Sequence, residues 1–84
     1  MKTTAHTKQL AGRITQLAMQ LSENTDHDVF VDYSPHVNWL VVLVYLGGWE
    51  RDTQSDLEVK VDLDSDDACD QLELAALKII EVCK

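Results

Sequence analysis

The sequence predicts a single small α+β domain with the element order α-β-β-β-α. Apolar residues recur at helical spacing near both ends of the chain, strand-like segments lie between them, and short turns separate those segments. Short connections favour a three-stranded antiparallel meander with both helices on one face of the sheet. A chain of 84 residues has the length of one domain, so residues 1–84 are assigned to it as a whole.

The first helix is expected over residues 5–23. Its apolar residues recur every three or four positions, as one face of an amphipathic helix requires. These residues are Leu10, Ile14, Leu17 and Leu21, with Ala11 and Ala18 beside them. The turn-forming residues Asn24, Thr25 and Asp26 then end the helix.

Three strands are expected to follow the first helix. Residues 28–33 and residues 57–63 alternate polar and apolar side chains, as half-buried strands do. The segment from Trp39 to Leu46 is a continuous apolar run rich in β-branched and aromatic residues, which predicts a central strand that is apolar on both faces. Pro35 lies in the first turn between strands, and Gly47-Gly48 begins the second.

The second helix is expected from about Asp66 to Val82. Its apolar stripe consists of Cys69, Leu72, Ala76, Ile79 and Cys83. Ser65 or Asp64 is expected to cap the N-terminus of this helix, where acidic side chains also suit the helix dipole. Both cysteines are expected to be small core residues with free thiols.

The register of the central strand decides which of its side chains the helices cover. A loop at residues 34–37 pairs Tyr33 with Asn38. The covered face then takes Val29, Val31, Tyr33, Leu40, Val42 and Val44, and the open face takes Phe30, Trp39, Val41, Leu43 and Tyr45. A slip of one residue would instead turn Trp39 and Tyr45 inward. An apolar stripe of this size on an uncovered sheet predicts a protein-binding surface.

Negative charge gathers in the second half of the chain. The net charge is −8, and between Gly47 and Lys84 eleven Asp or Glu stand against four Lys or Arg. This balance disfavours direct contact with nucleic acid or an anionic membrane, and it favours a basic protein partner. The second candidate surface, the acidic edge, consists of Asp62, Asp64, Asp66, Asp67 and Asp70.

No recognisable catalytic motif is present. The chain has no glycine-rich phosphate loop or nucleophile motif, and His6, His27 and His36 are far apart. The sequence therefore predicts no enzyme, no cofactor and no metal site. A calcium-binding module is a distant alternative, because Asp62, Asp64, Asp66, Asp70 and Glu73 have the spacing of EF-hand ligands. Asp67 stands where that loop needs glycine, and the entering element is expected to be a strand.

The N-terminal residues contain no long apolar run. The first sixteen residues are interrupted by Thr, His, Lys, Gln and Arg, so we expect neither a signal peptide nor a membrane span. The expected location is the cytoplasm, which would be that of a bacterial host if the protein is encoded by a phage.

Three resemblances bear on function. The double-stranded-RNA-binding domain has the same element order, but that family uses a Lys-rich helix start to bind phosphates, and here the stretch is Ser65-Asp66-Asp67-Ala68-Cys69-Asp70. The segment Asp28–Asn38, with Gly47-Gly48-Trp49, resembles small uncharacterised phage and prophage proteins. In size and acidity the chain is also similar to anti-CRISPR inhibitors, some of which present carboxylates in place of DNA phosphates.

These observations predict a small acidic interaction protein encoded by a phage or another mobile element. The leading hypothesis is an inhibitor or nucleic-acid mimic that binds a basic, nucleic-acid-handling host protein. The alternative is a structural homo-oligomer, expected to be a homodimer.

Overall fold

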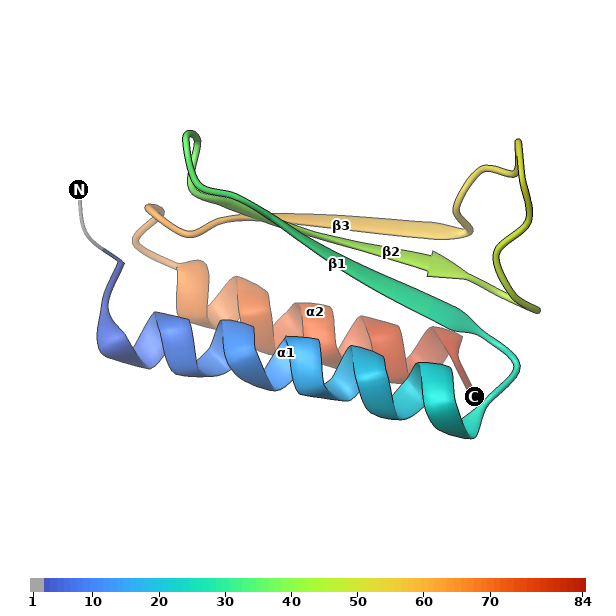
Figure 1. Ribbon diagram of the computed structural model, residues 1–84. Coiled ribbons are helices and arrows are strands. Elements are labelled where there is room, and N and C mark those ends of the chain that lie inside the picture. The colour runs from blue at the N-terminus through green and yellow to red at the C-terminus, as the bar shows by residue number, and fades with distance from the viewer. Residues whose placement is uncertain (1–2) are drawn as a thin grey trace.

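Two helices and three strands form a two-layer structure (Figure 1). The computed structural model describes residues 3–84. The elements are α1 (Ala5–Asn24), β1 (Asp28–Ser34), β2 (Trp39–Tyr45), β3 (Leu57–Asp62) and α2 (Ala68–Val82). The strands form an antiparallel meander with β2 in the middle, and both helices lie on the same side of the sheet. The α+β fold class and its meander topology are therefore confirmed.

The core lies between the sheet and the two helices. Its largest fully buried side chains are Leu72, Ile79, Val42, Val44 and Val61. The helix α1 contributes Leu10, Ile14 and Ala18 from one stripe, in agreement with the 3.6-residue period of its sequence. Along β2, buried and half-buried residues alternate, so Leu40, Val42 and Val44 face the helices as expected.

The predicted pairing of β1 with β2 is wrong by two residues. The structure pairs Tyr33 with Leu40 and Ser34 with Trp39, whereas the sequence interpretation paired Tyr33 with Asn38. Asn38 has a φ of 55°, a left-handed conformation that ends a loop and does not fit an extended strand. The loop therefore covers residues 35–38. Because side chains alternate along a strand, a shift of two residues leaves each of them on its predicted face.

The start of α2 also differs from the prediction. The helix begins at Ala68, and Asp67 occupies the N-cap position, where the sequence interpretation placed Ser65 or Asp64. The Asp67 carboxylate makes no capping bond to a backbone N–H. Instead it accepts hydrogen bonds from the Ser65 hydroxyl and from Gln71 Nε2, the latter at 2.6 Å. These side-chain bonds hold the residues before Ala68 in a tight turn, which delays the helix start.

Within residues 3–84, neither helix has the length together with the apolar composition needed to cross a membrane.

Candidate protein-binding surfaces

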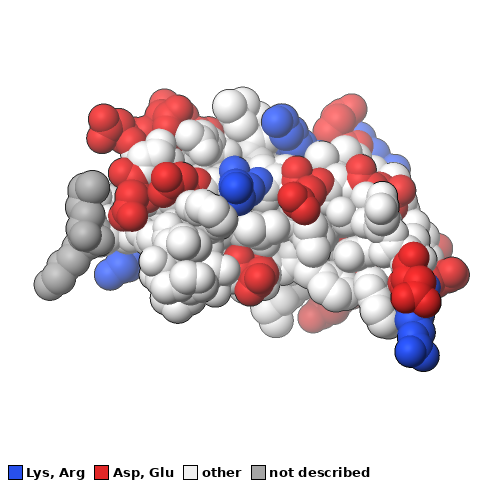
Figure 2. Space-filling model, turned by 90° about the horizontal axis from the view of Figure 1, so that it is seen from above, with Lys and Arg blue, Asp and Glu red and all other residues white. Residues whose placement is uncertain are grey.

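The side of the sheet opposite the helices is the first candidate surface, which we call the open face. Its central strand β2 projects Trp39, Val41, Leu43 and Tyr45, and β1 adds Phe30. These are the five residues predicted for this face. Phe30 lies beside Leu43, with which it pairs across the strands. Figure 2, seen from this side, shows uncharged surface along the middle of the molecule, with acidic groups on both sides of it and Lys or Arg groups among them.

Two contacts shield part of the open face. Lys60 Nζ lies 4.0 Å from the centroid of the Trp39 ring, a cation–π geometry. The rings of Phe30 and Tyr45 lie 5.3 Å apart at an interplanar angle of 56°. The β2 side chains of this face are half-buried, whereas Phe30 is 43% exposed. A partner that covers this face must pack around the Lys60 side chain or displace it.

Acidic side chains border the open face along both flanking strands. Asp28 and Asp32 of β1 share this face with Phe30, and Glu58 and Asp62 of β3 share it with Lys60. Asp28 has a structural contact, since its Oδ2 accepts a hydrogen bond from the Trp49 N–H at 2.7 Å. The border is thus mainly negative, with an apolar centre.

The acidic edge gathers in the turn between β3 and α2, at one end of the sheet. Asp62 Oδ1 accepts a hydrogen bond from the Asp64 N–H at 3.0 Å, and Asp64 Oδ1 accepts one from Asn38 Nδ2 at 2.8 Å. Together with Asp67, these carboxylates stabilise the turn. Within residues 3–84, the exposed carboxylates of Asp66 and Asp70 accept no hydrogen bond and form no ion pair. Those two are the members left available to a partner.

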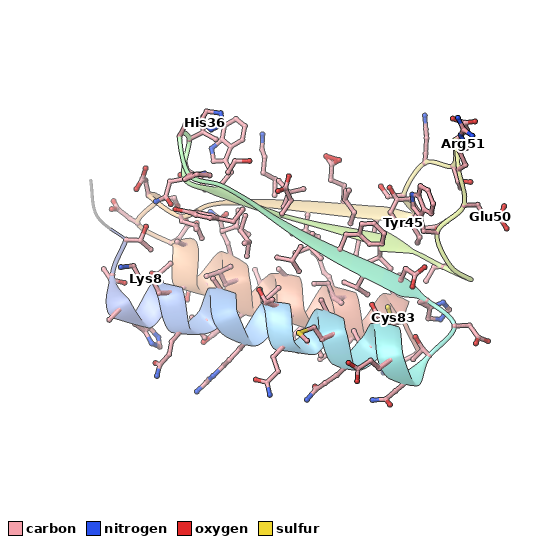
Figure 3. All side chains as sticks on the ribbon, viewed as in Figure 1. Lys8, His36, Tyr45, Glu50, Arg51 and Cys83 are labelled. Carbon is pink, nitrogen blue, oxygen red and sulfur yellow. The ribbon has the colours of Figure 1, made fainter. Side chains whose placement is uncertain are left out.

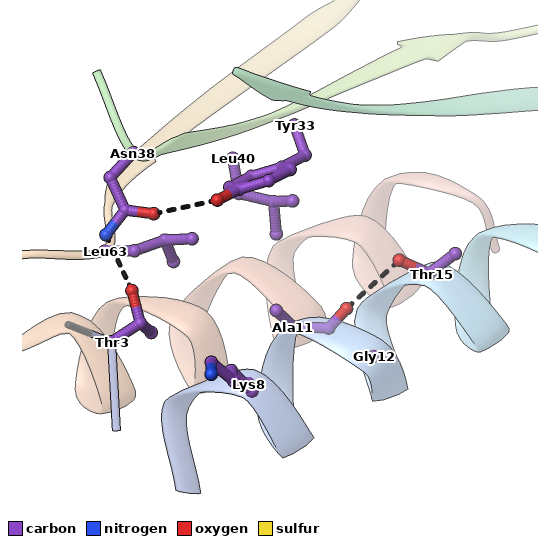
Figure 4. A pocket seen from close by; sticks show the side chains of 9 residues that line it. All are labelled: Thr3, Lys8, Ala11, Gly12, Thr15, Tyr33, Asn38, Leu40 and Leu63. Atoms are coloured by element: carbon purple, nitrogen blue, oxygen red, sulfur yellow. Dashed lines mark hydrogen bonds between the residues drawn. The ribbon is translucent and has the colours of Figure 1, made fainter. Parts of the chain in front are cut away.

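Asn38 is a structural residue that sequence reasoning missed. Its Nδ2 also donates to Thr3 Oγ1 at 2.7 Å (Figure 4). Its backbone carbonyl accepts a hydrogen bond from the Leu63 N–H at 2.9 Å. The Tyr33 hydroxyl donates to Asn38 Oδ1 at 3.4 Å. Asn38 therefore joins the N-terminal segment, the β1–β2 loop and the acidic edge. The sequence did contain a signal for this role. An Asn directly before a strand often ends a loop, because Asn tolerates the left-handed conformation.

The opposite end of the sheet is held by side-chain contacts to the β2–β3 loop. His27 Nδ1 accepts a hydrogen bond from the Gly47 N–H at 2.9 Å, and Asp56 Oδ2 accepts one from the Leu46 N–H at 2.7 Å. Gly47 and Gly48 have φ values of 80° and 103°, which favour glycine. Figure 3 shows His36 in the turn at one end of the sheet and the β2–β3 loop at the other.

The described residues do not gather into a metal centre. Within residues 3–84, no three His, Cys, Asp or Glu side chains are arranged to hold a metal ion. Both cysteines are free, and burial raises the pKa of the Cys83 thiol, which keeps it protonated and unreactive. Cys69 Sγ lies 3.3 Å from Thr7 Oγ1, in contact between α2 and α1.

Asp67→Asn is expected to reduce the dependence of stability on acid pH. Hydrogen bonds from Ser65 and Gln71 lower the pKa of Asp67, because they favour its charged form. A lowered folded-state pKa gives stabilisation that is present above the ordinary Asp pKa of about 3.9 and is lost as the pH falls through the folded-state value. Urea midpoints measured from neutral to acid pH should show this loss in the wild type and less of it in Asp67→Asn. Asp66→Asn is the control, and an equal reduction there would contradict the assignment.

Comparison of this chain with protein-family models, with curated proteins and with solved structures found no match. The two surfaces described above are therefore the observations from which a function is inferred.

Proposed function

We propose that this chain is a small, acidic, non-enzymatic protein-binding domain whose open face covers a surface of a basic protein. The observation that carries the proposal is the apolar row of Trp39, Val41 and Leu43 on a side of the sheet that no helix covers. An apolar centre with a charged border is the usual anatomy of a protein interface. The net charge of −8 attracts basic proteins over a distance and repels nucleic acid and anionic lipid.

The narrower form of the proposal is an inhibitor, encoded by a phage or another mobile element, that binds a nucleic-acid-handling host protein in the cytoplasm. The resemblance of Asp28–Asn38 to phage and prophage proteins supports this origin. The exposed carboxylates of Asp66 and Asp70 are the groups best placed to stand in for phosphates.

The second candidate is a homodimer formed through the same open face. The apolar row on β2 favours it, since a second copy would bury this row as well as a foreign protein would. The charged border of the open face disfavours such a homodimer. Two copies face to face would bring Asp32, Glu58 and Asp62 of each against like charges, with Lys60 as the basic side chain among them.

The test is affinity capture from a bacterial lysate at low salt, followed by binding measurements on the purified partner. Carboxylates that take the place of phosphates should make affinity fall steeply with salt, because surface charges are screened over about 8 Å at physiological ionic strength. The double variant Asp66→Asn/Asp70→Asn should then bind roughly tenfold more slowly, with a smaller change in dissociation rate.

The matched control is Asp26→Asn/Glu50→Gln, which removes the same amount of charge at the other end of the molecule. If both pairs slow association equally, only net charge matters and the acidic edge is not a binding site. If the captured protein is this chain alone, and it sediments as a dimer, the homodimer replaces the basic-partner proposal.

A further inference from the structure

The outer edge of β1 carries backbone groups that no strand pairs. Ser22 Oγ accepts a hydrogen bond from the Val29 N–H at 2.9 Å and lies 3.5 Å from the Val29 carbonyl, so the Val29 backbone points away from β2. In an antiparallel ladder alternate residues point the same way, so the N–H and C=O groups of Val31 and Tyr33 also point outward. Within residues 3–84 these groups have no hydrogen-bond partner.

A groove follows this edge between β1 and α1. It consists of two hollows of about 340 and 320 Å³, and Thr15 lines both. Tyr33 and Leu40 line the first hollow, and Val29 and Val31 line the second. Figure 4 shows the Tyr33 ring extending from the sheet above Ala11 and Lys8 of α1. Tyr33 was expected to be covered by the helices, but it is 53% exposed because small side chains of α1 leave this space open.

Gly12 keeps the wall of the groove open. It lies inside α1, where glycine is less favourable than alanine. A Cβ added at Gly12 would meet nothing within 4 Å, and its φ does not lie in the left-handed region. The fold itself therefore does not require a glycine here, whereas a segment that lies along the groove does benefit from the space.

We propose that an extended segment of a partner protein binds along β1 as a fourth, antiparallel strand. Its main chain pairs with the outward N–H and C=O groups of Val31 and Tyr33, as in other cases of strand addition. This binding site adjoins the open face only at its Asp28 and Asp32 border and uses neither the apolar row of β2 nor the acidic edge, so the inference stands even if those surfaces have no partner.

The two faces of the added strand lie against different residues, which determines the side chains that the bound segment needs. Side chains that face α1 enter the groove among Ala11, Leu40 and Leu63, so they are apolar. Side chains on the other side lie beside Asp28 and Asp32 of β1, so they are Lys or Arg. The segment that fits is an extended one in which apolar and basic residues alternate.

A second copy of this chain fits the edge less well. Paired strands lie about 4.8 Å apart, whereas packed helices lie about 8–10 Å apart. Since α1 packs against β1, pairing two β1 strands would bring two α1 helices closer together than helices pack. A single extended segment avoids this clash.

The test uses a capped peptide of about nine alternating Lys and Val residues, titrated into the isotope-labelled protein while amide NMR signals are followed. The Val31 and Tyr33 amides should shift saturably, and their hydrogen exchange should slow by at least about tenfold, because they gain partners. N-methylation of the Val residues removes the donors that face β1 and should weaken binding by at least about tenfold. N-methylation of the Lys residues, whose N–H groups face outward, is the matched control and should leave binding within about twofold.

Gly12→Leu tests the groove from the protein side. The leucine side chain should fill the hollow and lower the affinity for the peptide by at least about tenfold, while the protein stays folded. Gln20→Leu, exposed on the same helix and away from the groove, should bind like the wild type. The inference is overturned if the Val31 and Tyr33 amides do not respond at about 1 mM peptide. It is equally overturned if the two N-methylated peptides bind alike, because that result would show attraction by charge alone.

Discussion

Leu43→Lys is expected to abolish binding at the open face while leaving the domain folded. Leu43 lies in the middle of the sheet between Phe30 and Glu58, at the centre of the apolar row. A lysine there would place a charge in the part of the interface that loses its water and would oppose a basic partner. A loss of at least about 30-fold in affinity follows, because central apolar anchors contribute about 2 kcal/mol or more to binding. Calorimetric titration of the captured partner with the wild type and the variant measures this loss of affinity.

The same substitution on the other side of the molecule provides the control. Leu77 of α2 is 63% exposed and lies on the helix layer, so Leu77→Lys adds an equal charge away from the open face. Leu77→Lys should bind the partner within about twofold of the wild type. Equal losses in both variants would show that the open face is not the binding surface. For the homodimer, the corresponding result is a Leu43→Lys monomer and a Leu77→Lys dimer in sedimentation.

Leu72→Ala is expected to remove a large part of the unfolding free energy of the domain. The Leu72 side chain is 1% exposed and is among the largest fully buried groups of the core. Truncation of a buried leucine costs about 2–5 kcal/mol, and a domain of this size has roughly 4–13 kcal/mol in total. For a domain of this size, each kcal/mol lowers the melting temperature by about 4–8 °C, so a loss of at least about 8 °C is expected in thermal unfolding.

Leu74→Ala, two positions along the same helix, separates burial from helix propensity. Leu74 is 57% exposed, and alanine is at least as good a helix former as leucine. Its unfolding free energy should stay within about 0.5 kcal/mol of the wild type. A similar loss in both variants would mean that the cost comes from α2 itself and not from the core.

The elements of the fold could be predicted because β2 is a continuous apolar run and the other elements have a clear hydrophobic period. The helical stripe of α1 and the alternation in β3 reappear as buried and exposed positions. The pairing of β1 with β2 failed on one residue, since the left-handed conformation of Asn38 depends on its contacts with Thr3 and Asp64, which are distant in sequence. The predicted start of α2 was wrong for a local reason. The Asp67 side chain bonds to Ser65 and Gln71, which the hydrophobic period does not reveal.

The sequence predicted which residues share each candidate surface, but it did not predict the contacts that their side chains make. Alternation along β2 was enough to place Trp39 and Val41 together on the open face. It did not reveal that Lys60 lies over Trp39, or that Asp64 and Asp67 are engaged in the turn. The groove beside β1 was missed because it arises from the small side chains Ala11 and Gly12 beneath a strand edge.

The strand β2, apolar on both faces, has a consequence for the newly made chain. Before the helices cover one side, the segment from Trp39 to Tyr45 has high β-propensity and carries no charge, which is the composition of segments that aggregate. Its neighbours oppose this, because β1 pairs with it across the short loop 35–38 and β3 pairs with it across residues 46–56, and these strands carry Asp32 and Glu58 beside it. Local pairing of this kind forms quickly. The meander thus shortens the time during which β2 is open to other chains, and its acidic flanks keep those chains apart.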